Sequence, residues 1–170
     1  MERGRDPAPP CPVAMQIHEL ETPCAVVDLD RMFRNLDRAA RYATEHKLAL
    51  RPHVKTHKTA WIAAEQLQRG AAGVTCATPR EAEVMSGVCD DILLAYPPVG
   101  AKAPRVAELA RADKITVALD SLEAIESIER AAAAAGTQIG VYVEIDHGMH
   151  RVGVQATEAA IGLAKRIEHS

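Results

Sequence analysis

From Thr22 onward, short runs of apolar, often β-branched residues alternate with longer segments whose apolar positions recur at helical spacing. The short runs predict strands and the longer segments predict amphipathic helices. The expected strands are Cys24–Val27, Leu48–Val54, Gly73–Ala77, Ile92–Ala95, Ile115–Leu119 and Ile139–Ile145. The expected helices are Arg31–Glu45, Ala60–Arg69, Pro79–Ser86, Pro104–Arg111, Leu122–Ala135 and Thr157–Glu168. Successive strands begin roughly 20–25 residues apart, which is typical of β–α units in a parallel sheet.

Residues that favour helix ends stand at several of these boundaries. Thr78 and Glu81 flank Pro79 in the pattern of a capping box with proline at the first helical position. Asp30 and Ser121 are expected N-caps, and Gly70 and Gly136 follow helical stretches where a left-handed residue is common. The helix boundaries therefore have support beyond apolar spacing.

Alternating β–α units fit either a doubly wound open sheet or a (β/α)8 barrel, and both place their chemistry at the C-terminal ends of the strands. No Gly-x-Gly-x-x-Gly follows the first strand and no phosphate-loop pattern occurs, which weakens the nucleotide-binding doubly wound alternative. A barrel is favoured, although 170 residues is short against the roughly 250 of a typical barrel. The polar residues that follow predicted strands are Lys55, His57, Thr78, Tyr96, Asp120, Asp146 and His147.

Composition and charge exclude several classes of function. The chain is 48% apolar and 25% charged with a net charge of −3, so it has no basic footprint for nucleic acid. Aromatic residues make up only 3%, and no apolar run approaches the roughly 20 residues of a membrane span. Residues 1–20 are expected to form a disordered arm without a signal-peptide core, and residues 21–170 a single domain. A cytoplasmic protein is expected.

The cysteines Cys11, Cys24, Cys76 and Cys89 are widely spaced, which argues against a zinc knuckle or a disulfide framework. Cys24 and Cys76 lie in apolar runs and are expected to be buried as small hydrophobic side chains.

The segment of residues 51–58 is the first candidate for chemistry, because it places Lys55 near the end of a predicted strand. A lysine there can form a Schiff base with an aldehyde when burial or nearby cations lower its pKa, and Arg51 and Lys58 are such cations. His53 and His57 flank the lysine, but no glutamate stands beside the first histidine as in zinc-binding helices, so a metal site built on them alone has little support.

The second candidate is the segment of residues 144–153, which follows the last predicted strand. Its glycines allow close approach of a ligand to the backbone, and Arg151 offers a planar set of donors to an oxyanion. The alternative, a solvated charged loop without a ligand, is equally compatible with the residues alone.

Four segments resemble the D-threonine aldolase/D-serine dehydratase family, whose members have the alanine racemase type of barrel. They are residues 51–58 (Arg-Pro-His-Val-Lys-Thr-His-Lys), 73–78 (Gly-Val-Thr-Cys-Ala-Thr), 95–100 (Ala-Tyr-Pro-Pro-Val-Gly) and 144–153 (Glu-Ile-Asp-His-Gly-Met-His-Arg-Val-Gly). The resemblance extends over about residues 21–168. It implies pyridoxal 5′-phosphate (PLP) as cofactor, Lys55 as the lysine that carries it, Arg151 beside its phenolic oxygen, and His53 in the pocket.

The resemblance also implies an incomplete α/β parallel barrel. About five barrel strands would begin at Leu48, and the strand Cys24–Val27 would join a C-terminal β domain that lies beyond this sequence. The family's phosphate-binding loop and its ligands for a divalent metal (Mn, Mg or Zn) are likewise expected only there, so no metal ligand is expected in this chain. The 170 residues alone are therefore expected to be inactive.

The expected reaction of the complete enzyme is cleavage of a small D-β-hydroxy-amino acid into glycine and an aldehyde, with PLP as electron sink. The near alternative is D-serine dehydratase, which forms pyruvate and ammonia. A non-catalytic PLP-binding protein and an inactive fragment are further alternatives. A homodimer is expected for the complete protein.

Overall fold

The computed structural model of the chain describes residues 15–168 and divides into two compact units, Met1–Leu48 and Ala49–Ser170. Most of the expected N-terminal arm, and Cys11 with it, lies outside the described residues. Within the remainder of that arm, Ile17–Glu19 forms a short 3-10 helix. None of the helices in residues 15–168 is long and apolar enough to cross a bilayer.

The first unit contains the helix α1 (Leu29–Glu45). Its N-cap is Asp28, whose Oδ1 accepts a hydrogen bond from the Arg31 N–H at 2.9 Å, so the expectation of Asp30 is wrong. Asp30 instead lies in the first turn, where its negative charge interacts favourably with the positive end of the helix dipole. No strand forms over Cys24–Val27, because no backbone hydrogen bond joins this segment to another strand of the described chain. Cys24 is exposed rather than buried.

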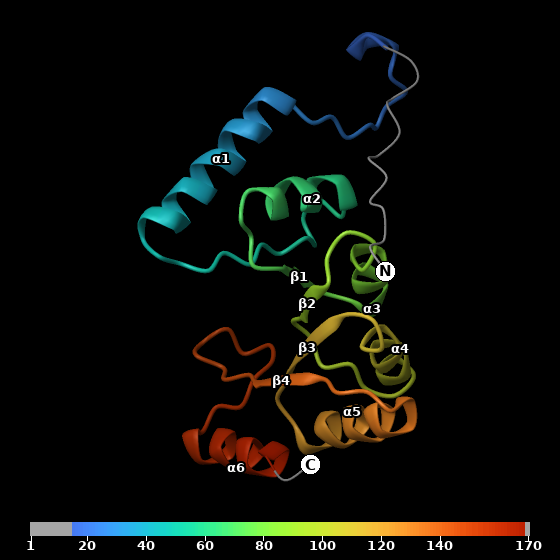
Figure 1. Cartoon of the computed structure of the whole chain (residues 1–170), viewed down its shortest axis with the longest axis vertical. Coiled ribbons are helices and arrows are strands. Elements are labelled where there is room, and N and C mark those ends of the chain that lie inside the picture. The colour runs from blue at the N-terminus through green and yellow to red at the C-terminus, as the bar shows by residue number, and fades with distance from the viewer. Residues whose placement is uncertain (1–14, 169–170) are drawn as a thin grey trace. The chain divides into compact units, whose positions relative to one another are not determined.

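The second unit is built on a parallel sheet of four strands in the order β1-β2-β3-β4. The strands are β1 (Val74–Cys76), β2 (Asp91–Leu94), β3 (Lys114–Leu119) and β4 (Gly140–Val143). Neighbouring strands pair in parallel, and a helix connects each strand to the next, as parallel pairing requires. Figure 1 shows the sheet and the helices that connect its strands.

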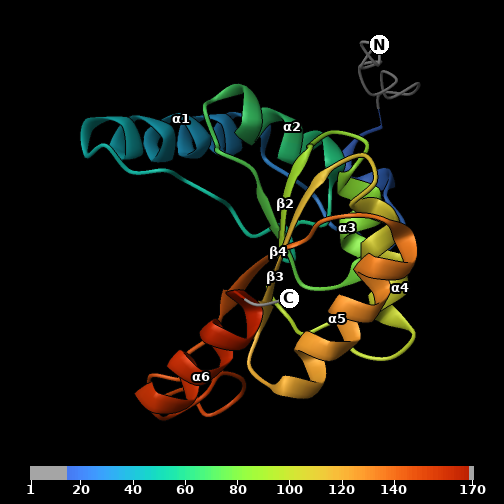
Figure 2. The same ribbon diagram turned by 60° about the horizontal axis from the view of Figure 1, so that its bottom comes forward.

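Helices cover one face of this sheet. The helices of this unit are α2 (Ala60–Gln68), α3 (Pro79–Met85), α4 (Lys102–Leu109), α5 (Leu122–Ala135) and α6 (Thr157–Glu168). Helices α3, α4 and α5 lie side by side along the sheet (Figures 1 and 2). The buried core between them includes Met85, Ile92, Leu94, Val106, Val117 and Leu119. Thr116 and Tyr142, at alternate strand positions, are more accessible, so the two faces of the sheet differ in burial.

The expected strand Leu48–Val54 is not formed as a regular strand. The chain runs beside β1 and shares three backbone hydrogen bonds with Ala72 and Thr75, but only His53 pairs with Thr75 as an isolated bridge. Pro52 has no N–H to donate, which interrupts the hydrogen-bond ladder on this segment. The sheet consequently has four regular strands rather than the five expected for the barrel part.

Candidate active site

A cavity of about 510 Å3 opens at the C-terminal ends of the strands in the second unit. Ala77 follows β1, Ala95 follows β2 and Glu144 follows β4, so the cavity lies where parallel β–α folds place their chemistry. The complete lining is His53, Lys55, Ala77, Ala95, Tyr96, Glu144, Arg151 and Val152. The three site residues expected from the sequence, Lys55, His53 and Arg151, thus border the same space, which we call the lysine pocket.

Lys55 lies in a turn just past the irregular segment that flanks β1. The buried Val54 anchors this turn, because its N–H donates to the Thr75 carbonyl at 2.9 Å. The turn closes when the Lys58 N–H donates to the Val54 carbonyl at 2.7 Å. Arg51, expected to act as a cation near Lys55, instead forms an ion pair with Asp91 at 2.8 Å. Asp91 begins β2, so this pair lies at the opposite ends of the strands from the pocket.

The two histidines of the octapeptide take different positions. His53 lines the pocket, and its pKa is lowered first by burial and then by the Lys55 charge. His57 does not line the pocket; its Nδ1 accepts from the Thr59 N–H at 3.1 Å, and burial lowers its pKa. The structure therefore separates a pocket histidine from a largely structural one. Among residues 15–168, no three His, Cys, Asp or Glu side chains converge to hold a metal ion.

Arg151 is carried by a loop whose first turn is organised by Asp146. The Asp146 Oδ1 accepts backbone hydrogen bonds from Gly148, Met149 and His150, each at 3.0 Å. These bonds, led by the one from His150, hold the pKa of the Asp146 carboxyl below its usual value. An ionised aspartate that accepts three amide hydrogens fixes the path of the loop up to His150.

The far end of the same loop returns to the sheet. The Gly153 N–H donates to Asp120 Oδ2 at 2.9 Å, and the Val154 N–H donates to the Glu144 carbonyl at 3.0 Å. Gly153 has φ +95, and a Cβ there would lie 2.5 Å from the Asp146 backbone nitrogen, so only glycine allows this close approach. With both ends tied down, the loop carries Arg151 at the edge of the lysine pocket.

Glu144 is a pocket residue that the sequence did not single out. Its Oε2 is buried without a hydrogen-bond partner among the described residues. Burial raises the pKa of Glu144, the nearby Asp120 raises it further, and Arg151 opposes both. The sequence could have indicated that Glu144 stands at the end of β4. It could not have indicated that the carboxyl is buried near Asp120 and Arg151.

Replacing Glu144 with glutamine should stabilise the chain at neutral pH by about 1 kcal/mol, because it removes a charge that burial penalises. The pKa of Glu144 is higher in the folded than in the unfolded chain, so its contribution to stability is complete below the unfolded pKa and is lost as pH rises through the folded pKa. The gain from glutamine should therefore vanish in acid. Urea unfolding of both proteins across this pH range measures it, and equal stability at neutral pH would contradict the prediction.

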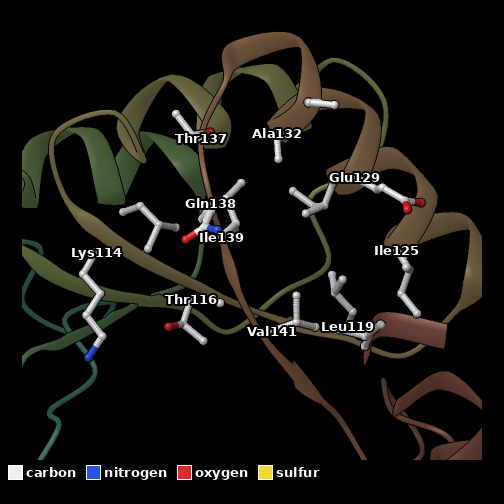
Figure 3. A pocket seen from close by; sticks show the side chains of 15 residues that line it. Lys114, Thr116, Leu119, Ile125, Glu129, Ala132, Thr137, Gln138, Ile139 and Val141 are labelled. Atoms are coloured by element: carbon white, nitrogen blue, oxygen red, sulfur yellow. The ribbon is translucent and has the colours of Figure 1, made fainter. Parts of the chain in front are cut away.

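A larger cavity of about 670 Å3 lies elsewhere, between α5 and the strands β3 and β4. Figure 3 shows Leu119 and Val141 of the strands on one side of this space and Ala132 of α5 on another. Its lining is mostly apolar, and its charged members are Lys114 and Glu129. Glu129 is already paired with Arg166 at 2.6 Å. The lysine pocket is smaller but brings together an amine, a guanidinium, an imidazole and a carboxyl, so it is the stronger candidate for chemistry.

Comparison with known proteins identifies similar chains. Residues 27–170 match the protein-family model described as "Alanine racemase, N-terminal domain". A D-threonine aldolase of Arthrobacter sp. is 36% identical over 167 residues, which are 96% of this chain and 44% of that protein. A D-threo-3-hydroxyaspartate dehydratase of Delftia sp. (strain HT23) is 37% identical over 147 residues, covering 85% of this chain and 39% of that protein.

Comparison with solved structures shows a similar fold. The crystal structure of D-threonine aldolase from Filomicrobium marinum matches with a TM-score of 0.85 and 36% identity, over 88% of this chain and 41% of that one. The chain thus spans about two fifths of the length of these similar proteins.

Proposed function

Because the chain belongs to the family of alanine racemase N-terminal domains, we propose that its lysine pocket binds PLP and serves a lyase that acts on D-β-hydroxy-amino acids. The observation that carries the proposal is the convergence of Lys55, His53 and Arg151 on one pocket at the ends of the strands. The aldolase and dehydratase relatives support the class of substrate, since the names of both proteins refer to D-amino acids with a hydroxyl on the β-carbon.

The donor set of the pocket fits this cofactor. Lys55 supplies an amine that can bond to an aldehyde, and Arg151 supplies a guanidinium suited to a phenolic oxygen. Glu144 lines the same pocket, and its carboxyl can act as an acceptor or, when protonated, as a donor. When bound, PLP supplies an electron sink for the reacting carbon. His53, whose pKa is lowered by burial and then by Lys55, would be neutral at physiological pH and able to accept or donate a proton in the pocket.

Cleavage of the carbon–carbon bond, giving glycine and an aldehyde, is the reaction we favour, since the D-threonine aldolase of Arthrobacter sp. is similar over nearly the whole of this chain. Dehydration is the second candidate, because a dehydratase of nearly equal identity matches as well. D-Serine is a further substrate candidate for that reaction. The two reactions differ in the fate of the β-hydroxyl, so the products separate them: an aldehyde for cleavage, and a keto acid with ammonia for dehydration.

For the whole protein we also propose that it uses a divalent metal, forms a homodimer and is located in the cytoplasm. Residues 15–168 contain no converging set of metal ligands. Size-exclusion chromatography with light scattering tests the dimer.

The site itself is tested by labelling. The chain is incubated with PLP, reduced with borohydride and digested for peptide mapping. The label should lie on Lys55 rather than on Lys58, because only Lys55 of the two lines the pocket. Lys58 carries an ion pair with Glu81 instead. Label on Lys58 alone, or spread evenly over surface lysines, would overturn the proposed site.

A further inference from the structure

Glu81 contacts more than its own helix. The sequence assigned it to a capping box, in which its carboxylate would accept from the N–H of the N-cap residue Thr78. Thr78 does cap α3, since its Oγ1 accepts from the Glu81 N–H at 3.2 Å. The Glu81 carboxylate, however, accepts from the N–H of Ala77 at 2.7 Å through Oε2 and from the Lys58 ammonium through Oε1. Both of its oxygens are therefore used outside helix α3.

These contacts join two sides of the lysine pocket. Ala77 follows β1 and lines the pocket, whereas Lys58 ends the turn that carries Lys55. We call residues 54–58 the lysine turn. Its first residue, Val54, is fully buried, but its last, Lys58, is exposed apart from the contact with Glu81. Glu81 thus supplies a side-chain anchor at the exposed end of the turn.

The backbone at Lys58 needs such an anchor. Lys58 has φ +52, a left-handed conformation that is unfavourable for a residue other than glycine. Glu81 is only 8% exposed, so its ion pair with Lys58 is partly shielded from water. Burial works to raise the pKa of Glu81, but hydrogen bonds from Lys58 and Ala77 outweigh it and hold that pKa below its usual value. The carboxylate is ionised at neutral pH and able to hold the Lys58 ammonium.

We propose that Glu81 is a positioning residue that ties the lysine turn to the end of β1 and so directs Lys55 into the pocket. Glu81 does not line the pocket itself, and it acts through Lys58 and Ala77. The proposal deepens and rests on the proposed function, in which Lys55 carries PLP. The alternative is that Glu81 only stabilises α3, a role that would not reach Lys55.

The test compares Glu81→Gln with the unchanged chain by two measurements. The first is hydrogen exchange without PLP at the Lys58 amide, which donates to Val54 and closes the turn. The second is the rate at which PLP and borohydride label Lys55. Loss of the ion pair should lower the protection of the Lys58 amide and the labelling rate by about tenfold each. Lys58→Met should reproduce both changes, and the double variant should add little, since the two side chains act as a pair.

Two control variants separate positioning from helix stability. Thr78→Ala removes the N-cap of α3 without touching the turn, and Glu83→Gln breaks a salt bridge of the same helix to Arg105. Both should leave the Lys58 amide and the labelling rate within about twofold of the unchanged chain. If Thr78→Ala matches Glu81→Gln in both measurements, Glu81 acts only through helix stability and the inference is refuted.

The exchange measurement is independent of the cofactor. Unchanged protection of Lys58 in Glu81→Gln refutes the positioning role whether or not Lys55 takes PLP. Lost protection with no label on Lys55 in any chain supports the anchor and refutes the proposed function instead. Glutamine keeps the shape of the side chain, and an unfolding midpoint close to that of the unchanged chain ensures that the comparison is made on folded protein.

Discussion

Lys55→Ala should abolish the visible absorbance that PLP acquires on binding and weaken PLP binding by about 100-fold or more, equivalent to roughly 3 kcal/mol. The reason is the loss of the amine that we propose bonds to the cofactor, whereas the pocket and the turn remain. Lys55 is exposed and its side chain makes no ion pair among the described residues, so alanine should leave the stability nearly unchanged. Absorbance titration with PLP measures both effects.

A nearby lysine provides the control. Lys102 lies over the Tyr96 ring at 5.6 Å, close to the pocket but not in its lining. Lys102→Ala should keep the visible band and bind PLP within about threefold of the unchanged chain. If Lys55→Ala retains the band, or if both variants lose it equally, Lys55 is not the residue that holds the cofactor.

The alternating β–α order of the fold could be predicted because local signals agreed with one another. The expected helices Leu122–Ala135 and Thr157–Glu168 have the observed bounds. For α5, both ends are marked by residues with a physical role, since Ser121 caps the start and Gly136 takes φ +66 at the end. Apolar spacing and caps indicated the β–α units, and the resemblance of four segments, among them residues 51–58, indicated the family, which the comparisons confirm.

The errors arose where the outcome depended on partners rather than on local pattern. The run Leu48–Val54 is apolar enough for a strand, but Pro52 breaks its ladder and leaves one bridge. Asp28 and Asp30 both stand near the start of α1, and either residue could cap the helix. In the structure Asp28 is the N-cap. The sequence suggested that Arg51 would act as a cation beside Lys55. In the structure Arg51 forms an ion pair with Asp91 instead. Such choices are made by tertiary contacts that sequence periodicity does not contain.

In the candidate site, too, some residues could be predicted from local pattern and others depend on tertiary contacts. Lys55, His53 and Arg151 could be proposed because they stand near the ends of predicted strands in segments that resemble the family, and they border one pocket. Glu144 and Glu81 could not be proposed, since one looks like a strand-end residue and the other like a helix cap. Their surroundings involve residues of other segments: Asp120 and Arg151 act on the pKa of Glu144, and Lys58 of the lysine turn donates to Glu81.

Arg151→Ala should weaken PLP binding by about tenfold and shift upward the pH midpoint of the absorbance of bound PLP. A guanidinium beside the phenolic oxygen stabilises the anionic form of that oxygen. Removing the guanidinium therefore raises the pKa of the phenolic group of bound PLP. A charged hydrogen bond is worth about 1.5–3 kcal/mol when shielded, and the exposure of Arg151 favours the lower end. The same change should raise the pKa of Glu144 further, since burial and Asp120 already raise it and Arg151 opposes them.

Two variants decide what the guanidinium contributes. Arg151→Lys keeps the charge but loses the planar fork, so it should restore much of the pH midpoint and less of the affinity. Arg111→Ala removes an exposed arginine that lies just past the end of α4 and pairs with Glu108 of that helix, and it should change neither quantity. The loop is held by Asp146 and by the Gly153 contact with Asp120, not by the Arg151 side chain, so the alanine variant should keep the loop in place. An unchanged midpoint together with unchanged affinity would mean that Arg151 borders the pocket without touching the cofactor.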